Sequence, residues 1–230
     1  MNQEDIAKYG DELYDALTQR HTLSPLTERA PEITIEDAYQ ISLRMVQRRV
    51  DAGEKIVGKK IGVSSKAVQE MLNVHQPDFG FLTNGMVYDN GCDMPISTRL
   101  MQPRAEGELA FRLKSDLVGP NITEDDVLAA TESVVPCFEI VDSRIENWKI
   151  KIQDTVADNA SCGLFLLGDT ETDPNGVDLA APKMTVYKND KVISEGFGSA
   201  ALGNPLTCVA WLANTLGQFG VKLNAGDVVL

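Results

Sequence analysis

The stretch QPRAEGELAF, residues 102–111, decides how the rest of the sequence is interpreted, because it combines a strand pattern with two acidic residues. Successive side chains of a strand point to opposite faces, so Glu106 and Glu108 share a face with Ala110, while Phe111 lies on the other. Two carboxylates ~4–5 Å apart repel each other by roughly 3–4 kcal/mol at an effective dielectric constant near 20. Protonation, a basic partner, solvent or a bound cation must therefore offset this repulsion.

The composition predicts an ordinary soluble globular protein, since the chain has 230 residues, of which 43% are hydrophobic and 24% charged. A formal net charge of −13 argues against nucleic acids and anionic membranes as partners. No apolar run is long enough to cross a bilayer, and the N-terminus is acidic and polar, so we expect a cytoplasmic protein. Four scattered cysteines fit neither a zinc site nor a disulfide framework, and we expect reduced core or near-core residues.

The first 55 residues carry a helical pattern. Apolar residues spaced three or four apart over Ile6–Leu17 predict an amphipathic helix. A second helix is expected to begin after the N-cap Thr34 and to stop near Gly53. From residue 56 the sequence changes to short, glycine-punctuated apolar runs, so we expect an N-terminal helical segment, 1–55, packed on a mixed-β core, 56–230.

Six runs in this core predict strands: IVGKKIGV, FGFLTNGMVYDNG, AEGELAFRL, VVPCFEIVDSR, MTVYKNDKVISEGFG and DVVL. Two helices are expected between them: ITEDDVLAATESV, capped by Thr123, and PLTCVAWLANTLGQFG, with Pro205 near its start. Asn189 and Asp190 form the turn of an expected hairpin.

A third acid extends the opening pattern, because Glu139 lies on a buried-looking face of the expected strand CFEIVDSR. Together with Glu106 and Glu108 it would form an all-oxygen ligand set of the kind that Mg²⁺ or Mn²⁺ prefers. The alternative is a solvated pair on one strand, with Glu139 bound to Arg104 or Arg144. Because E-x-E pairs are common, spacing alone favours this alternative.

Three further segments offer polar groups to a site. GKKIG places Lys59 and Lys60 between glycines, where one lysine would face inward toward an anion, or both would lie on the surface, which the residues alone favour. Asp78, in HQPDFGF, caps a turn or serves as an acid or base. Ser161, in DTVADNASCG, binds a substrate carboxylate or orders a loop, and the sequence leaves both open.

Other common chemistries lack support in the sequence. The two histidines, His21 and His75, have no recognisable nucleophile context, which argues against a Ser-His or Cys-His hydrolase. Neither a dinucleotide-binding glycine motif after a strand nor a phosphate-binding loop occurs, so nucleotide cofactors are not expected.

Five stretches in one order, GKKIGVSSKAVQ, HQPDFGFLTNGMV, QPRAEGELAF, PCFEIVDSRIENWKIKIQDTVADNASCG and CVAWLANTLGQFG, resemble the 2-oxopent-4-enoate hydratases, also called 2-hydroxypenta-2,4-dienoate hydratases. These belong to the hydratase and decarboxylase branch of the fumarylacetoacetate hydrolase superfamily and act in the meta-cleavage pathway of aromatic catabolism. The resemblance implies an α+β fold with a mixed β-roll core. It also implies Mg²⁺ or Mn²⁺ held by Glu106, Glu108 and Glu139.

The same resemblance implies roles for the other candidates. Lys60 and Asp78 become the expected catalytic residues, and Lys60 and Ser161 the expected contacts to a small 2-oxo acid substrate. The implied reaction adds water to 2-hydroxypenta-2,4-dienoate and gives 4-hydroxy-2-oxopentanoate. The rival activity in this branch is 2-oxo-3-hexenedioate (4-oxalocrotonate) decarboxylation, and a non-catalytic partner subunit is a further alternative.

Assembly and extent follow from the resemblance as well. It implies a homo-oligomer and allows a complex with the pathway decarboxylase. Related sequences continue beyond the stretch AGDVVL into further strands, so the core 56–230 is expected to lack the last C-terminal strands of the family.

Overall fold

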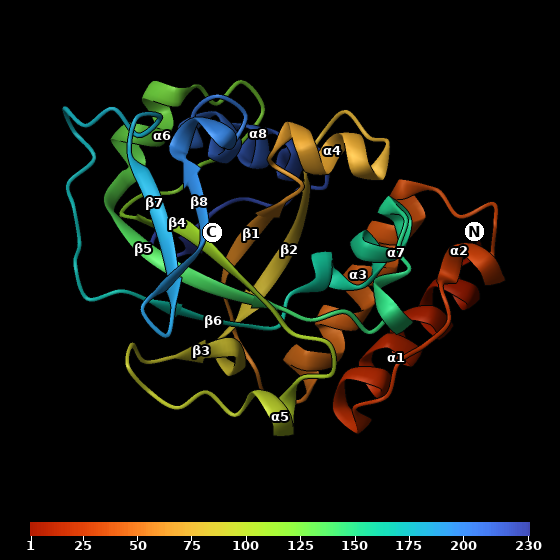
Figure 1. The fold of residues 1–230 in the computed structure, drawn as a ribbon. Helices are drawn as coiled ribbons and strands as arrows, with labels where there is room; N and C mark the ends of the chain where they lie inside the picture. Colours follow the sequence, from red (N-terminus) through yellow and green to blue (C-terminus); the bar gives the residue numbers. More distant parts are fainter. The chain divides into compact units, whose positions relative to one another are not determined.

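A computed structural model describes residues 1–230 (Figure 1). These residues form two compact units. The first unit contains Met1–Gly62, Asp78–Glu106 and Phe138–Leu166. The second unit contains Val63–Pro77, Gly107–Cys137 and Leu167–Leu230. The boundary between the units therefore falls within a strand three times, in β4, β5 and β6.

The α-helices are α1 (Gln3–Gln19), α2 (Leu26–Arg29), α3 (Ile35–Asp51), α4 (Lys66–Leu72), α5 (Ile96–Arg99), α6 (Glu124–Ala130), α7 (Ile152–Ala157) and α8 (Pro205–Gln218). Four short 3-10 helices are η1 (Asn84–Met86), η2 (Glu146–Trp148), η3 (Asn159–Ser161) and η4 (Gly198–Ala200). The strands are β1 (Ile56–Gly62), β2 (Asp78–Thr83), β3 (Val87–Tyr88), β4 (Arg104–Leu113), β5 (Thr131–Val141), β6 (Leu164–Leu167), β7 (Lys183–Lys188), β8 (Lys191–Phe197) and β9 (Val228–Val229).

In the first unit, α1 and α3 pack side by side (Figure 1). Both expected helices are confirmed, and α3 begins with a capping box in which Thr34 and Asp37 satisfy each other's backbone N–H groups. Gly10 permits the close approach, because a Cβ there would lie 2.5 Å from Cγ of Arg44. The apolar stripes of both helices are buried, that of α1 against α3 and that of α3 against α1 and α7.

The same unit pairs β1 with β2 antiparallel and β3 with β6 parallel, so its strand pairing is mixed. In the β1–β2 register Lys60 lies opposite Gly80, and Gly62 lies opposite Asp78. The ladder thus brings the lysine of one strand and the aspartate of the next into one region of the interior.

In the second unit, β4 pairs with β9 antiparallel, with Phe111 opposite Val229. Strands β7 and β8 form a separate two-stranded sheet, and Asn189 and Asp190 at its turn have φ values of 48° and 61°. The expected hairpin and the helix α8 are confirmed. The expected α+β class with mixed strand pairing is confirmed as well.

Several local expectations were wrong. The helix after Thr123 ends at Ala130, because Thr131 is already extended and its β-branched run continues as β5. Helices α4 and α7 were not expected. The four cysteines are free thiols, but Cys92 is exposed instead of near the core. None of the helices has the length and apolar character that a membrane span requires.

Candidate active site

Three carboxylates gather where β4 and β5 carry them. Glu106, Glu108 and Glu139 each offer one oxygen, and these oxygens lie within 4.8 Å of one another. The two-residue period of β4 puts Glu106 and Glu108 on one face, as the sequence predicts. Glu106 is exposed and Glu108 half-buried, whereas only 1% of Glu139 is exposed. The trio therefore runs from solvent to the interior.

This donor set fits a hard divalent cation. All three ligands are carboxylates, which Mg²⁺, Mn²⁺ and Ca²⁺ prefer, and no thiolate or imidazole belongs to the group. Oε1 of Glu139 is buried and accepts no hydrogen bond from the protein. A buried, unsatisfied carboxylate oxygen is costly, and a cation between the three side chains would satisfy it.

Lys60 is the buried cationic partner of Glu139. Its Nζ lies 3.2 Å from Oε2 of Glu139 and donates a hydrogen bond of 3.1 Å to the carbonyl of Ala160. The alternative pairing of Glu139 with an arginine is wrong, because Arg144 binds Asp158 and Arg104 lies over the Trp148 ring.

The expectation of two surface lysines is also wrong, since Lys59 is 2% exposed and Lys60 is 4% exposed. Both lysine side chains of GKKIG therefore lie in the interior of the first unit.

The electrostatics of the pair follow from burial and proximity. Burial lowers the pKa of Lys60, but the negative charge of Glu139 and of weaker neighbours outweighs it, and this pKa stands well above its usual value. Burial raises the pKa of Glu139 to about 7, although Lys60 pulls it down. Lys60 therefore stays protonated at neutral pH, while Glu139 is poised to exchange a proton or a cation.

Asp78 opens β2 and is buried, with 2% of its surface exposed, instead of capping an exposed turn. Its Oδ1 lies against Gly62, where a Cβ would stand 2.1 Å away. Burial raises its pKa, Lys60 opposes that shift, and the charge of Glu106 adds to it. Asp78 therefore has the environment of a carboxyl group that holds a proton more readily than an exposed aspartate.

Ser161 ends a strained loop. Asn159, Ala160 and Ser161 have φ values of 52°, 50° and 54°, a left-handed run that only tight local contacts maintain. The side-chain oxygens of Ser161 and Thr155 are 3.2 Å apart. Asn159 accepts a hydrogen bond from the backbone N–H of Phe81 and donates one to its carbonyl. The segment orders a loop through these contacts, and it also sets the carbonyl that Lys60 binds.

Sequence reasoning missed Asp142 and Asp158, and it considered Arg144 only as a partner of Glu139. Arg144 and Asp158 form a fully buried ion pair, and Asp142, also fully buried, accepts hydrogen bonds from the backbone N–H groups of Met101 and Gln102. The signal that could have found them is the charged stretch DSR directly after an apolar strand, since charges there need partners.

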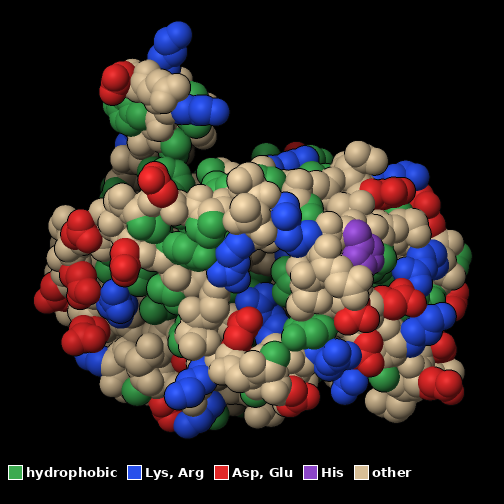
Figure 2. Space-filling view, turned by 90° about the horizontal axis from the view of Figure 1, so that it is seen from below, with side chains coloured by type: hydrophobic (Ala, Val, Ile, Leu, Met, Phe, Trp, Pro, Cys, Tyr) green, Lys and Arg blue, Asp and Glu red, His purple; other side chains and the backbone are tan.

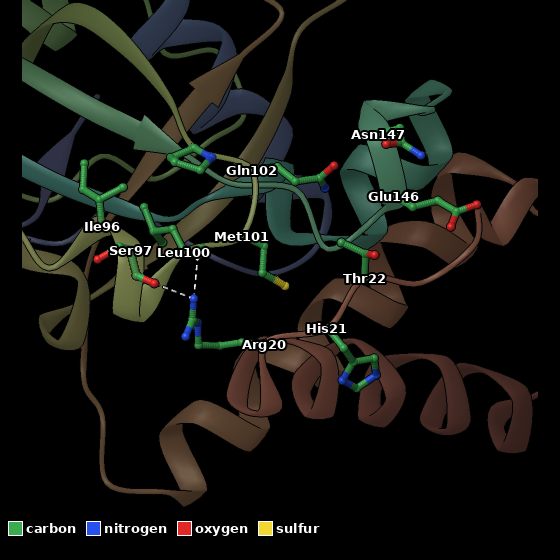
Figure 3. A pocket seen from close by; sticks show the side chains of 11 residues that line it. Arg20, His21, Thr22, Ile96, Ser97, Leu100, Met101, Gln102, Glu146 and Asn147 are labelled. Atoms are coloured by element: carbon green, nitrogen blue, oxygen red, sulfur yellow. Dashed lines mark hydrogen bonds between the residues drawn. The ribbon is translucent and has the colours of Figure 1, made fainter.

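A surface pocket of about 810 Å³ also belongs to the first unit (Figure 3). Arg20 closes one side of it by donating hydrogen bonds to the carbonyls of Ser97 and Leu100. The lining residues are Arg20, His21, Thr22, Ile96, Ser97, Leu100, Met101, Gln102, Pro103, Glu146 and Asn147. The predicted site residues are absent from this lining, so the pocket does not mark their position.

The charge of the surface agrees with the composition. Acidic and basic side chains both occur across the face seen in Figure 2, and no broad area of it carries lysine and arginine alone.

Among known proteins, several hydratases are similar to this chain in sequence. A 2-hydroxypent-2,4-dienoate hydratase from Pseudomonas putida is 65% identical over 221 residues, covering 96% of this chain and 100% of the relative. A 2-hydroxyhexa-2,4-dienoate hydratase from Comamonas testosteroni is 59% identical over 230 residues, covering 100% of this chain and 87% of the relative. No family model matches the chain.

Solved structures agree in fold. The 4-oxalocrotonate decarboxylase from Pseudomonas putida G7, complexed with magnesium and adipate, is 34% identical with a TM-score of 0.96, covering 100% of this chain and 87% of that one. A fumarylacetoacetate hydrolase from Exiguobacterium antarcticum has a TM-score of 0.56 at 13% identity, covering 76% of this chain and 61% of that one, and shows the fold alone.

Proposed function

Because the chain belongs to the 2-keto-4-pentenoate hydratase family of the fumarylacetoacetate hydrolase superfamily, we propose that it adds water to 2-hydroxypenta-2,4-dienoate and releases 4-hydroxy-2-oxopentanoate. The observation that carries the proposal is the buried ion pair of Lys60 and Glu139 beside the other two carboxylates. The ammonium group of Lys60, held beside a set of oxygen ligands for a metal ion, suits a substrate with a carboxylate and a neighbouring 2-oxygen.

Glu106, Glu108 and Glu139 are proposed to hold Mg²⁺ or Mn²⁺, as their oxygen donors and spacing allow. When bound, the ion would act as a Lewis acid toward the carboxylate and the C2 oxygen of the substrate. The decarboxylase neighbour was solved with magnesium and, in a second structure, with calcium, so that related protein binds divalent cations of this class.

The protein's own residues then serve proton transfer. Protonation at C5 and loss of the C2 hydroxyl proton convert the dienol to a 2-oxo-3-enoate, whose C4 accepts water while C3 takes a proton. Lys60, which stays protonated, would stabilise the negative charge that develops on the C2 oxygen. Asp78, with its raised pKa, would donate and accept the protons. Ser161 would orient the substrate carboxylate by a hydrogen bond.

The test is the loss of ultraviolet absorbance of freshly generated 2-hydroxypenta-2,4-dienoate, with the product identified by mass in ¹⁸O-labelled water. The protein should be freed of metal by chelation and then supplied with Mg²⁺ or Mn²⁺. We expect Glu106→Gln and Lys60→Met to lower kcat/KM by at least ~100-fold, the scale of losing one preorganised charged group. Glu132→Gln, an exposed glutamate on β5, is the matched control. Full turnover and metal affinity in Glu106→Gln would refute the ligand assignment.

Decarboxylation of 2-oxo-3-hexenedioate is the competing activity, because the solved decarboxylase shares the fold at a TM-score of 0.96. Identity to the hydratases, 59% and 65%, exceeds the 34% to that decarboxylase and favours hydration. Metal-dependent release of CO₂ without a water adduct would reverse this preference.

The proposal includes a cytoplasmic homo-oligomer that can associate with the pathway decarboxylase, as the family resemblance implies. Light scattering of the purified protein tests the first point. Co-elution with the purified decarboxylase tests the second, and a monomer that never co-elutes would remove both.

A further inference from the structure

Directly after β5 the chain enters a segment whose buried polar side chains have no part in the proposed reaction. Asp142, Ser143 and Arg144 are each 0% exposed. They follow Glu139 by only a few residues, and their hydrogen-bond partners also belong to the first unit. Buried charges of this kind need complete hydrogen bonding, and here the bonds lead to two separate parts of the site.

Asp142 connects the segment to the beginning of β4. Its carboxylate accepts hydrogen bonds from the backbone N–H of Met101, at 3.0 Å, and of Gln102, at 2.6 Å. The Gln102 side chain returns the contact by donating to the carbonyls of Ser143 and Ile145, both at 2.8 Å. Since β4 begins at Arg104, these bonds hold the residues that lead directly into the strand that carries Glu106.

Arg144 connects the same segment to the loop that holds Lys60. Its guanidinium binds the Asp158 carboxylate and donates to the carbonyls of Asp158 and Cys162, the latter at 2.7 Å. Its backbone N–H donates to the second oxygen of Asp158, at 2.9 Å. These anchors lie on both sides of the left-handed run Asn159–Ser161, whose central carbonyl, that of Ala160, accepts the hydrogen bond of Lys60.

We propose that Asp142 and Arg144 are positioning residues with separate tasks, Asp142 for the carboxylate Glu106 and Arg144, through Asp158, for the amine of Lys60. This inference rests on the proposed function and deepens it. Partners behind a site commonly change affinity or activity by about 10–100-fold when they are replaced, because they fix the orientation of the groups in front of them. The two tasks predict that replacements will separate metal binding from turnover.

The test compares Asp142→Asn with Asp158→Asn and Arg144→Lys in the full-length protein. Each Asp→Asn change keeps the side-chain shape but replaces an oxygen that accepts a hydrogen bond by an amide donor. We expect Asp142→Asn to weaken Mg²⁺ binding, measured by calorimetry, about 10–100-fold. We expect Asp158→Asn and Arg144→Lys to lower kcat by a similar factor, with Mg²⁺ affinity and KM within about twofold of the parent.

Amide hydrogen exchange supplies a readout that does not depend on activity. Asp142→Asn should speed exchange at residues 101–106, and Asp158→Asn at residues 158–162, each leaving the other segment unchanged. Asp11→Asn, which breaks the half-exposed pair with Arg44, is the matched control and should alter neither segment nor kcat. If the protein does not hydrate the dienoate but the two variants still change exchange in separate segments, the proposed function is refuted and the positioning roles stand.

The inference is overturned if Asp142→Asn and Asp158→Asn change Mg²⁺ affinity, kcat and exchange in the same proportion, as a general loosening of the fold would do. Retention of parental values in both variants overturns it too. If Arg144→Lys does not fold, Asp158→Asn still decides the question, because it leaves Arg144 in place.

Discussion

The interior of the first unit and the β7–β8 hairpin of the second unit reverse the usual distribution of residues. The first buries charged side chains, among them Lys60, Glu139 and Arg144, whereas the hairpin leaves Ile193 60% and Phe197 56% exposed. Buried charges are rare unless they are paired, and exposed apolar groups in numbers are typical of contact surfaces. The comparison teaches that burial follows pairing: charged side chains are buried where they have partners, while the hairpin leaves apolar side chains in water.

The largest effect on stability should come from breaking the buried ion pair of Arg144 and Asp158. Arg144→Met leaves Asp158 charged in an apolar interior, so we expect the free energy of unfolding in urea to fall by ~3–5 kcal/mol at pH 8. Burial, opposed by Arg144, already raises the pKa of Asp158 to about 6, and loss of the arginine should raise it further. The folded variant then binds a proton more readily than the unfolded chain, so the deficit should shrink from pH 8 to pH 5.

The Arg44–Asp11 pair supplies the control for this change, because it joins the same residue types on the surface. Arg44→Met should cost at most about 1 kcal/mol, with little dependence on pH over this range. Equal losses in the two variants would contradict the special cost assigned to the interior of the first unit.

A somewhat smaller effect is expected from Mg²⁺. A cation that binds only the folded protein should stabilise it by about 2.7 kcal/mol at one hundred times its dissociation constant. Burial raises the pKa of Glu139 to about 7, and protonation competes with the cation, so this gain should fall as the pH drops below 7. Thermal unfolding with Mg²⁺ and with EDTA, at pH 8 and pH 6, measures it, and a gain that grows toward pH 6 would exclude Glu139 as a ligand.

Helix capping should stabilise both units equally, and the capping boxes at Thr34 and Thr123 allow a test. Thr34→Ala at α3 and Thr123→Ala at α6 should each lower the free energy of unfolding by about 1 kcal/mol, because each removes the acceptor for an N–H of the first turn. The matched changes Thr34→Ser and Thr123→Ser keep that acceptor and should cost a few tenths. A loss confined to one unit would mean that its helix end is held by packing instead.

The sequence predicts features that depend on neighbouring residues better than features that depend on residues far apart in the chain. The strand β4, the caps at Thr34 and Thr123 and the turn at Asn189 depend on neighbouring residues, and all appear as expected. The helix α7 was missed because its six residues are too few to show a helical repeat in the sequence.

The candidate site was predictable in its residue types but not in its pairings. Lys60 and Glu139 come from distant parts of the chain, and spacing alone favoured surface lysines and an arginine partner for the glutamate. The pairing of Arg144 with Asp158 also depends on how β5 and the loop after α7 pack. Such contacts form only when distant parts of the chain pack together, so the spacing of residues in the sequence does not reveal them.

The smallest effect should come from the exposed side of the hairpin. Ile193→Thr keeps a β-branched side chain and removes apolar surface that is already in water, so the free energy of unfolding should change by no more than about 0.5 kcal/mol. Val186→Thr is the matched change in the same hairpin, because Val186 is half-buried and its Cγ2 lies near Gly107. It should cost more, since the added hydroxyl enters a packed contact. Urea unfolding at a low protein concentration measures both, and a cost at Ile193 that equals the cost at Val186 would show that this face is packed in solution. A cost at Ile193 that appears only at high concentration would identify the face as one that another copy covers.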